Sequence, residues 1–125
     1  MTKQENLNDK WDVQLRKGTL ELVILAALKE RTLYGLELLK LLHSFETMKI
    51  TEGTLYPLMD RLKRDELVSA LWRQEGDTRP RKYYQLTQQG AKKLEALTNR
   101  WRQSVEDIET LIQNPSPQPI NPKGE

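Results

Sequence analysis

The sequence predicts a mainly helical fold of the α+β class, in which three helices precede a β-hairpin and one long helix follows it. Three observations carry this prediction. Apolar residues recur at helical spacing in three segments between residues 15 and 67. Two short β-capable runs then flank a turn-rich stretch. From residue 88 to residue 113 the helical spacing returns.

Composition excludes several classes of protein. The chain has 125 residues, 37% hydrophobic and 30% charged, which is typical of a soluble globular protein. The longest apolar run, residues 20–28, is too short to span a bilayer, and we expect no signal peptide. Cysteine is absent and His43 is the only histidine, so we expect neither disulfides nor a metal site. The absence of cysteine fits a cytoplasmic protein. Without a catalytic triad or a glycine-rich phosphate loop, we expect a protein that is not an enzyme and uses no cofactor.

The first 28 residues predict two helical segments. Leu7, Trp11 and Leu15 recur every four residues, which indicates a short amphipathic helix over residues 5–15. We therefore take residues 1–14 as an N-terminal helical extension. Residues 15–28 are apolar around most of a helix circumference, which is typical of a buried helix, and they open the predicted domain of residues 15–87.

Two further helices follow. Residues 34–45 form the second, and its inner face carries Leu38, Leu41, Leu42 and Phe45. Thr51 is the expected N-cap of the third helix, and Glu52 is favourable in its first turn. Because Pro57 interrupts helical hydrogen bonding, we expect the most regular part of this helix to begin near it. The apolar positions of the third helix are Leu55, Leu58, Met59, Leu62 and Leu67.

A hairpin and a long helix complete the chain. Residues 69–75 and 81–87 read as strands, and residues 76–80 form the tip between them. In residues 88–113, the apolar stripe has the alternating spacing of coiled-coil core positions. At about 1.5 Å per residue this helix would be roughly 39 Å long, too long to bury its stripe within one small domain. We predict that it joins two copies into a homodimer and that residues 114–125, rich in proline, are disordered.

Three helices, a hairpin and a projecting helix are the elements of a winged helix-turn-helix domain with a dimerisation helix. In that arrangement the third helix enters the major groove of double-stranded DNA, and the hairpin reaches the neighbouring backbone or minor groove. DNA is therefore the expected partner.

Three segments resemble the PadR family of bacterial regulators: LRKGTLELVILAALKERTLYG, ITEGTLYPLMDRLKRDELV and RPRKYYQLTQQG. The likeness spans residues 15–112, and the single C-terminal helix is similar to the shorter subfamily. The resemblance implies a homodimeric winged-helix protein, usually a repressor, that a small and often aromatic effector releases from its operator.

Two positions depart from the family pattern. Glu66 stands where the family usually has glycine in the turn after the third helix. If this turn needs a positive φ, Glu66 costs about 1 kcal/mol. Leu36 stands where tyrosine is common, and we expect that change to affect core packing alone.

The candidate DNA-binding residues lie on the third helix and on the hairpin. Thr51 and Tyr56 have alternative structural roles, as a cap and as a packing residue, and Arg61 could instead pair with Asp60 or Asp65. Two arginines beside Pro80 on a projecting tip suit a phosphate row or a narrow minor groove. The full set is Thr51, Glu52, Thr54, Tyr56, Arg61, Arg79, Arg81, Lys82 and Tyr83.

The candidate dimer interface follows the apolar stripes of the two terminal helices. Its members are Leu7, Trp11, Leu94, Leu97, Trp101, Ile108 and Leu111. Near the middle of the long helix, two copies of Trp101 would either stack on each other or part to hold a flat ligand. The candidate effector site is Trp101, Leu97, Leu15 and Leu22, whereas we expect Trp11 and Trp72 to be mainly structural.

Two rival functions stay open at this stage. The winged helix could bind another protein through its long helix, or it could bind DNA with no effector. The basic hairpin tip favours DNA.

Overall fold

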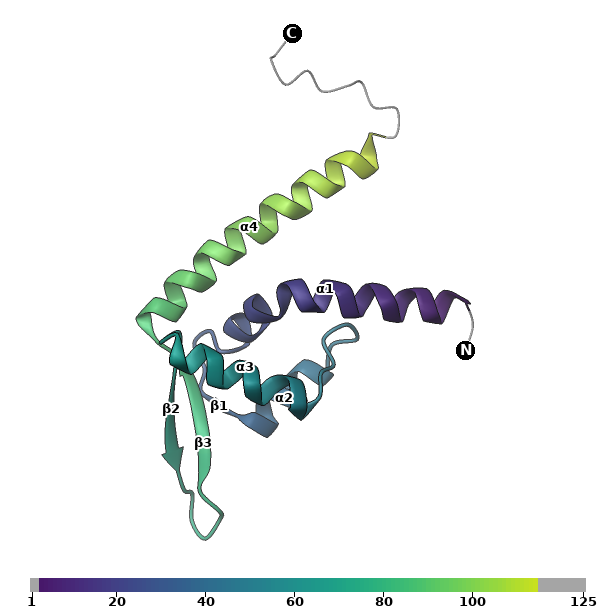
Figure 1. Ribbon diagram of the computed structural model, residues 1–125. Helices are drawn as coiled ribbons and strands as arrows, with labels where there is room; N and C mark the ends of the chain where they lie inside the picture. Colours follow the sequence, from purple (N-terminus) through teal and green to yellow (C-terminus); the bar gives the residue numbers. More distant parts are fainter. Residues whose placement is uncertain (1–2, 115–125) are drawn as a thin grey trace. The chain divides into compact units, whose positions relative to one another are not determined.

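The computed structural model describes residues 3–114 and contains four helices and three strands in that range. In chain order they are α1 (Lys3–Ala27), β1 (Leu33–Tyr34), α2 (Gly35–His43), α3 (Glu52–Arg64), β2 (Val68–Arg73), β3 (Arg81–Leu86) and α4 (Gln88–Gln113) (Figure 1). The chain divides into one compact unit up to Leu94 and a second that begins at Glu95 within α4. The fold class is the predicted one. The proline-rich tail beyond residue 114 lies outside the described residues.

The N-terminal helix is longer than predicted. Where two segments were expected, α1 runs unbroken through residues 14 and 15. Gly18 lies inside it, and a glycine within a helix lowers stability without ending the helix. The buried part of α1 is its C-terminal turn, where Ile24, Leu25 and Ala27 enter the core and Leu28 follows directly.

The second helix stops two residues before Phe45, which we had expected on its inner face. The N–H groups of Ser44 and Phe45 donate to the carbonyls of Leu41 and Leu42, so the chain tightens and turns away after His43. Phe45 is consequently half-exposed and lies off the core, so that prediction was wrong.

The third helix begins at its predicted cap. The Thr54 N–H donates to the Thr51 side-chain oxygen at 3.2 Å, which satisfies one of the free N–H groups of the first turn. The expectation that regular helix begins near Pro57 was wrong, because Pro57 lies inside α3, five residues after its start. The N–H that proline lacks removes a single helical bond, and the buried face of Leu55, Met59 and Leu62 holds the helix in place.

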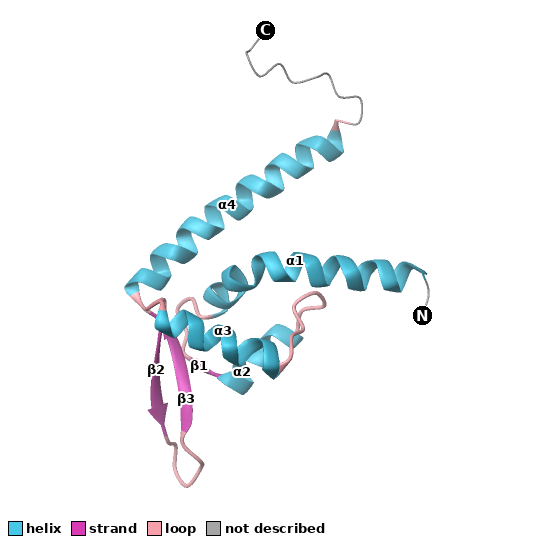
Figure 2. Ribbon diagram, viewed as in Figure 1, coloured by secondary structure: helices cyan, strands magenta, loops and turns pink. Residues whose placement is uncertain are grey.

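The strands form one antiparallel sheet in the order β1-β3-β2 (Figure 2). In its register, Val68 pairs with Leu86 and Arg73 with Arg81. We call residues 68–86, the two strands and the turn between them, the wing. The two-residue strand β1 was not predicted, because it is too short for a periodic pattern and pairs with residues about fifty positions away: Leu33 with Tyr84 and Tyr34 with Tyr83.

The turn after α3 has the left-handed conformation that would explain why the family usually has glycine there. Glu66 has φ 62°. Its N–H donates to Lys63 and the following N–H, from Leu67, donates to the Leu62 carbonyl at 2.9 Å, which is the Schellman pattern. Position 66 does need a positive φ, and an L-residue such as Glu66 is strained in that conformation.

The long helix α4 has the predicted bounds, but its first turns belong to the core. The Thr87 hydroxyl accepts from the Gly90 N–H at 2.9 Å, and a β-carbon at Gly90 would lie 2.9 Å from the carbonyl carbon of Leu67. Leu94, predicted at the dimer interface, is only 7% exposed. It packs within its own chain, because the start of α4 lies closely against Leu67, just after α3.

Candidate DNA-binding surface

The N-terminal half of α3 presents an open face. Thr51, Glu52 and Thr54 are all exposed around the start of the helix. Gly53 and Pro57 lie four residues apart on the same exposed side and carry little side chain. The backbone of α3 is thus able to approach another surface closely, a feature that the pattern of polar side chains did not predict.

Tyr56 is both a packing residue and a surface residue. Its ring crosses Gly35, and a β-carbon there would lie 2.7 Å from Cε1. The phenol remains partly exposed, and burial, together with the charge of Glu52, raises its pKa. The hydroxyl of Tyr56 is accordingly protonated at neutral pH and available as a hydrogen-bond donor.

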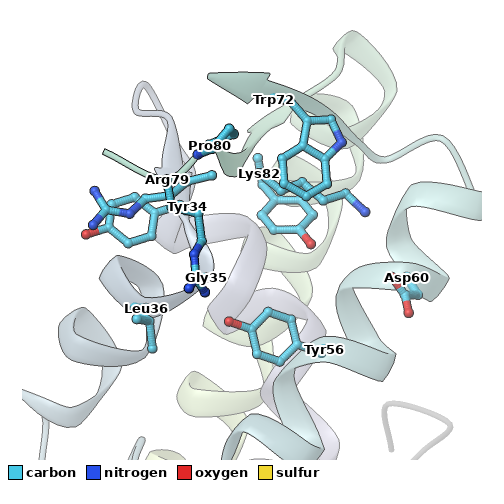
Figure 3. A pocket seen from close by; sticks show the side chains of 11 residues that line it. Tyr34, Gly35, Leu36, Tyr56, Asp60, Trp72, Arg79, Pro80 and Lys82 are labelled. Carbon is cyan, nitrogen blue, oxygen red and sulfur yellow. The ribbon is translucent and has the colours of Figure 1, made fainter. Parts of the chain in front are cut away.

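An open hollow of about 630 Å³ lies between α3 and the wing (Figure 3). Trp72 and Pro80 lie across it from Tyr56 and Leu36. The hollow is lined by Tyr34, Gly35, Leu36, Tyr56, Asp60, Trp72, Arg79, Pro80, Arg81, Lys82 and Tyr84. It brings together three of the predicted hairpin cations and one predicted residue of α3, Tyr56.

The wing cations rest on aromatic rings. The Arg81 guanidinium lies 4.6 Å from the ring centroid of Tyr34, and the Lys82 ammonium lies 5.7 Å from that of Tyr84. Arg79 is exposed beside Pro80 at the tip, where Gly76 turns the chain with φ 60°. Arg81 and Lys82 are neighbours on β3 and so point to opposite faces of the sheet, Arg81 toward Tyr34 and Lys82 toward Tyr84.

Arg61 has carboxylate partners within the protomer. Its guanidinium contacts Glu21 of α1 at 2.9 Å and Asp65 at 3.5 Å, and Lys93 adds a fourth charge at 3.4 Å from Glu21. Of the two alternatives weighed for Arg61, pairing with Asp65 is observed. We therefore leave Arg61 out of the proposed interface, since it links α3 to α1.

Tyr83 also leaves the proposed interface. Its side chain is 7% exposed and meets Tyr34 edge to face, with 5.3 Å between the ring centroids and an angle of 74°. Neighbouring residues of a strand point to opposite faces, so sequence position beside Lys82 did not imply the same exposure.

Two residues at the hollow were misjudged from sequence. Leu36, expected to affect core packing alone, is 49% exposed, because it lies on the outer side of α2. Trp72, expected to be structural, is 70% exposed. Its pairing with Lys82 across the hairpin is the signal that could have found it, because directly paired residues share a face.

The remaining predicted residues lie on two helices. On α1, Leu7, Trp11 and Leu15 are exposed and Leu22 is partly covered. On α4 beyond Leu94, Leu97 is partly covered, and the exposed apolar side chains are Trp101, Val105, Ile108, Leu111 and Ile112. The assignments of these residues to a dimer interface and an effector site stay predictions.

Residues 3–114 contain neither a membrane-spanning helix nor a metal-ligand cluster. None of the helices in this range is apolar enough over a sufficient length to cross a membrane. In the same range, no three acidic or histidine side chains come together as metal ligands.

The three helices, the wing and the cations beside α3 define a winged-helix protein of the class that regulates transcription. The family model described as the transcriptional regulator PadR-like family matches residues 24–96, and this chain belongs to that family. It is accordingly a DNA-binding transcriptional regulator, and its family is not one of enzymes.

Solved structures of the family are similar over most of their length. A PadR-like transcription factor from Bacteroides fragilis is 35% identical, with a TM-score of 0.67 over 82% of this chain and 98% of that one. A PadR family regulator from Eggerthella lenta is 32% identical, with a TM-score of 0.75 over 87% and 95%. An uncharacterized protein of Lysinibacillus sphaericus is 29% identical over 99 residues, 78% of this chain and 91% of that protein.

Proposed function

We propose that this chain is a homodimeric repressor that places α3 in a major groove and the wing against the flanking DNA backbone. The hollow between α3 and the wing carries the proposal, because wing cations and Tyr56 of α3 line it together, next to the exposed start of that helix. A major groove admits one helix, and phosphates next to it would meet the wing.

Base recognition by α3 would use small polar side chains. Glu52 suits the amino group of cytosine, and the Thr54 methyl and hydroxyl suit thymine or a phosphate. Tyr56 adds a neutral hydroxyl donor. The exposed start of α3 lacks arginine, so we expect modest discrimination per base and a large phosphate contribution.

Dimerisation would use the exposed apolar stripe of α4, with Trp101, Ile108 and Leu111 as its core and Leu97 beside them. Leu7 and Trp11 of α1 are further contributors. A dimer is what operator symmetry needs, because two recognition helices read half-sites about 34 Å apart.

Repression would be relieved by a small planar hydrophobic compound. Trp101, 40% exposed, is the expected contact of that compound, together with Leu97 on α4 and Leu15 and Leu22 on α1. A ligand that binds the released state better shifts the population away from DNA. The expected result is that Trp101→Ala retains DNA binding and loses the response to planar compounds. Tight binding of such compounds to the variant would move the effector site elsewhere.

The DNA-binding test uses a gel shift with a duplex from upstream of the chain's own gene, at several salt concentrations. Replacing Arg79, Arg81 and Lys82 with Ala should weaken binding to all sequences. The salt slope, the change in log K with log salt concentration, should shrink by about 2.7, because each lost phosphate contact accounts for about 0.9. Thr54→Ala should alter sequence preference more than affinity. An unchanged slope in the triple variant would exclude the wing from the phosphate contacts.

The dimer test changes Leu97 and Ile108 together to Glu. Uncompensated charges in an apolar interface cost several kcal/mol, so light scattering should report monomers. The matched control is Asn99→Glu with Gln103→Glu, two exposed positions of α4 outside the stripe, which should stay dimeric. A dimer in the first variant would refute this interface.

A further inference from the structure

Four side chains form one cluster on a single face of the sheet: Tyr34 on β1, Tyr83 and Arg81 on β3, and Arg73 on β2. Arg73 pairs with Arg81 in the register, and Tyr34 pairs with Tyr83. Directly paired residues share a face, and Arg81 and Tyr83 are two positions apart on one strand, so all four point the same way. We call them the Arg–Tyr cluster.

Each arginine of the cluster stacks on a tyrosine. The Arg73 guanidinium lies 4.7 Å from the ring centroid of Tyr83, and that of Arg81 lies 4.6 Å from the centroid of Tyr34. The two rings contact each other edge to face, and Tyr83 is buried. Arg73 therefore rests on a buried ring, and Arg81 rests on the half-buried ring of Tyr34, which Tyr83 contacts from the core.

The pairing of the two arginines is unfavourable by itself. Like charges directly opposite each other on a sheet are destabilising, and the contacts with Tyr83 and Tyr34 offset this cost. Among the described side chains, neither guanidinium has a carboxylate partner, in contrast to Arg61. Both arginines are exposed. Two fixed, exposed cations without a counter-charge are suited to an anion outside the protomer.

We propose that Arg73 and Arg81 together bind the phosphodiester backbone of DNA, with Tyr34 and Tyr83 as positioning residues. A guanidinium stacked by its face keeps its N–H groups free at the edges, which matches the oxygens of a phosphate. The inference rests on the proposed function, and it adds Arg73, at the end of β2, to the wing cations. Stacking reduces the side-chain entropy that each arginine would lose on binding.

The test measures the salt dependence of binding to the upstream duplex and to a scrambled duplex of equal length. Arg73→Ala should reduce the slope by about 0.9 and weaken binding to both duplexes by about tenfold. Arg31→Ala is the matched control, because Arg31 is also exposed but precedes Thr32, which contacts Gln85 near the base of the sheet. It should leave the slope unchanged. An unchanged slope in Arg73→Ala would overturn the proposal.

A second pair of variants tests the positioning role. Tyr34→Leu removes the ring under Arg81 and retains all charges, so affinity should fall about two- to fivefold with no change in slope. Tyr34→Phe retains the ring and should bind like the parent, with circular dichroism checking both folds. Equal affinity of the Leu and Phe variants would refute positioning by stacking. A parent chain that binds neither duplex would instead refute the proposed function and this inference with it.

Discussion

The phenol ring of Tyr56 lies directly over the α-carbon of Gly35, so the first residue of α2 has no room for a side chain. A β-carbon at Gly35 would lie 2.7 Å from Cε1 and 2.8 Å from Cζ of the ring. This contact ties α3 to the start of α2, and it holds the exposed edge of Tyr56 at the hollow beside the wing. Glycine at position 35 is thus required by packing against Tyr56.

A double-mutant cycle measures this contact. Gly35→Ala should destabilise the chain by about 1–3 kcal/mol through overpacking, measured by urea denaturation. In a Tyr56→Ala background the same change should be milder, with a coupling energy of about 0.5–3 kcal/mol. Additive effects would show that Gly35 is needed for a reason other than Tyr56.

Gly90 and Gly18 should respond oppositely to alanine. A β-carbon at Gly90 meets the backbone of Leu67, which is unable to move independently, so Gly90→Ala should cost about 1–3 kcal/mol. Gly18 lies inside α1 with nothing within 4 Å of the added carbon, and Gly18→Ala should stabilise by about 0.5–1 kcal/mol. Thermal and urea unfolding of both variants check the signs. If Gly18→Ala instead loses stability, the surface of α1 around Gly18 is covered in the folded protein.

Glu66→Gly should stabilise the chain. The left-handed conformation costs an L-residue about 1–2 kcal/mol, which glycine avoids. The extra freedom of glycine in the unfolded chain lowers this gain by about 0.5–1 kcal/mol. The net gain is about 0.5–1 kcal/mol in urea unfolding. Glu46→Gly, in the loop after α2 and without a positive φ, is the control and should destabilise. Equal effects at the two positions would contradict strain at Glu66.

Trp72→Ala should weaken DNA binding without altering the salt slope. The exposed indole has no charge and lies at the hollow beside Lys82, where it would meet the apolar face of a sugar. Phe45→Ala removes another exposed ring, outside the hollow, and should have no effect. Gel shifts of both variants at three salt concentrations decide the matter. If Trp72→Ala binds DNA as tightly as the parent, the wing contributes to binding through its cations alone.

The stability of the chain should fall in alkaline solution partly through Tyr84. Burial, and then the charge of Asp60 and the neighbouring Tyr56, raise the pKa of Tyr84. A raised pKa in the folded state means that the unfolded phenol ionises first, so this contribution is complete below pH 10 and is lost as pH rises through the folded pKa. Urea unfolding of Tyr84→Phe should show a shallower decline above pH 10 than the parent. Parallel declines would mean that Tyr84 ionises equally in both states.

Patterns among residues close together in the sequence were sufficient to predict much of the secondary structure of this protein. The spacing of apolar residues predicted α2, α3, α4 and, as two separate segments, α1. Thr51 predicted the start of α3, and the turn at Gly76 predicted the wing. These features depend on hydrogen bonds and backbone angles within a few residues, so the sequence alone determines them.

The tertiary structure decided which side chains are available for binding. Arg61 pairs with Glu21, forty positions away, and Tyr83 is covered while Trp72 is exposed. The strand β1 and the stacking of Arg81 on Tyr34 likewise join distant parts of the chain. Sequence alone predicts a helix, a turn or a cation. Whether that cation has a partner depends on contacts between residues far apart in sequence, which exist only in the folded domain.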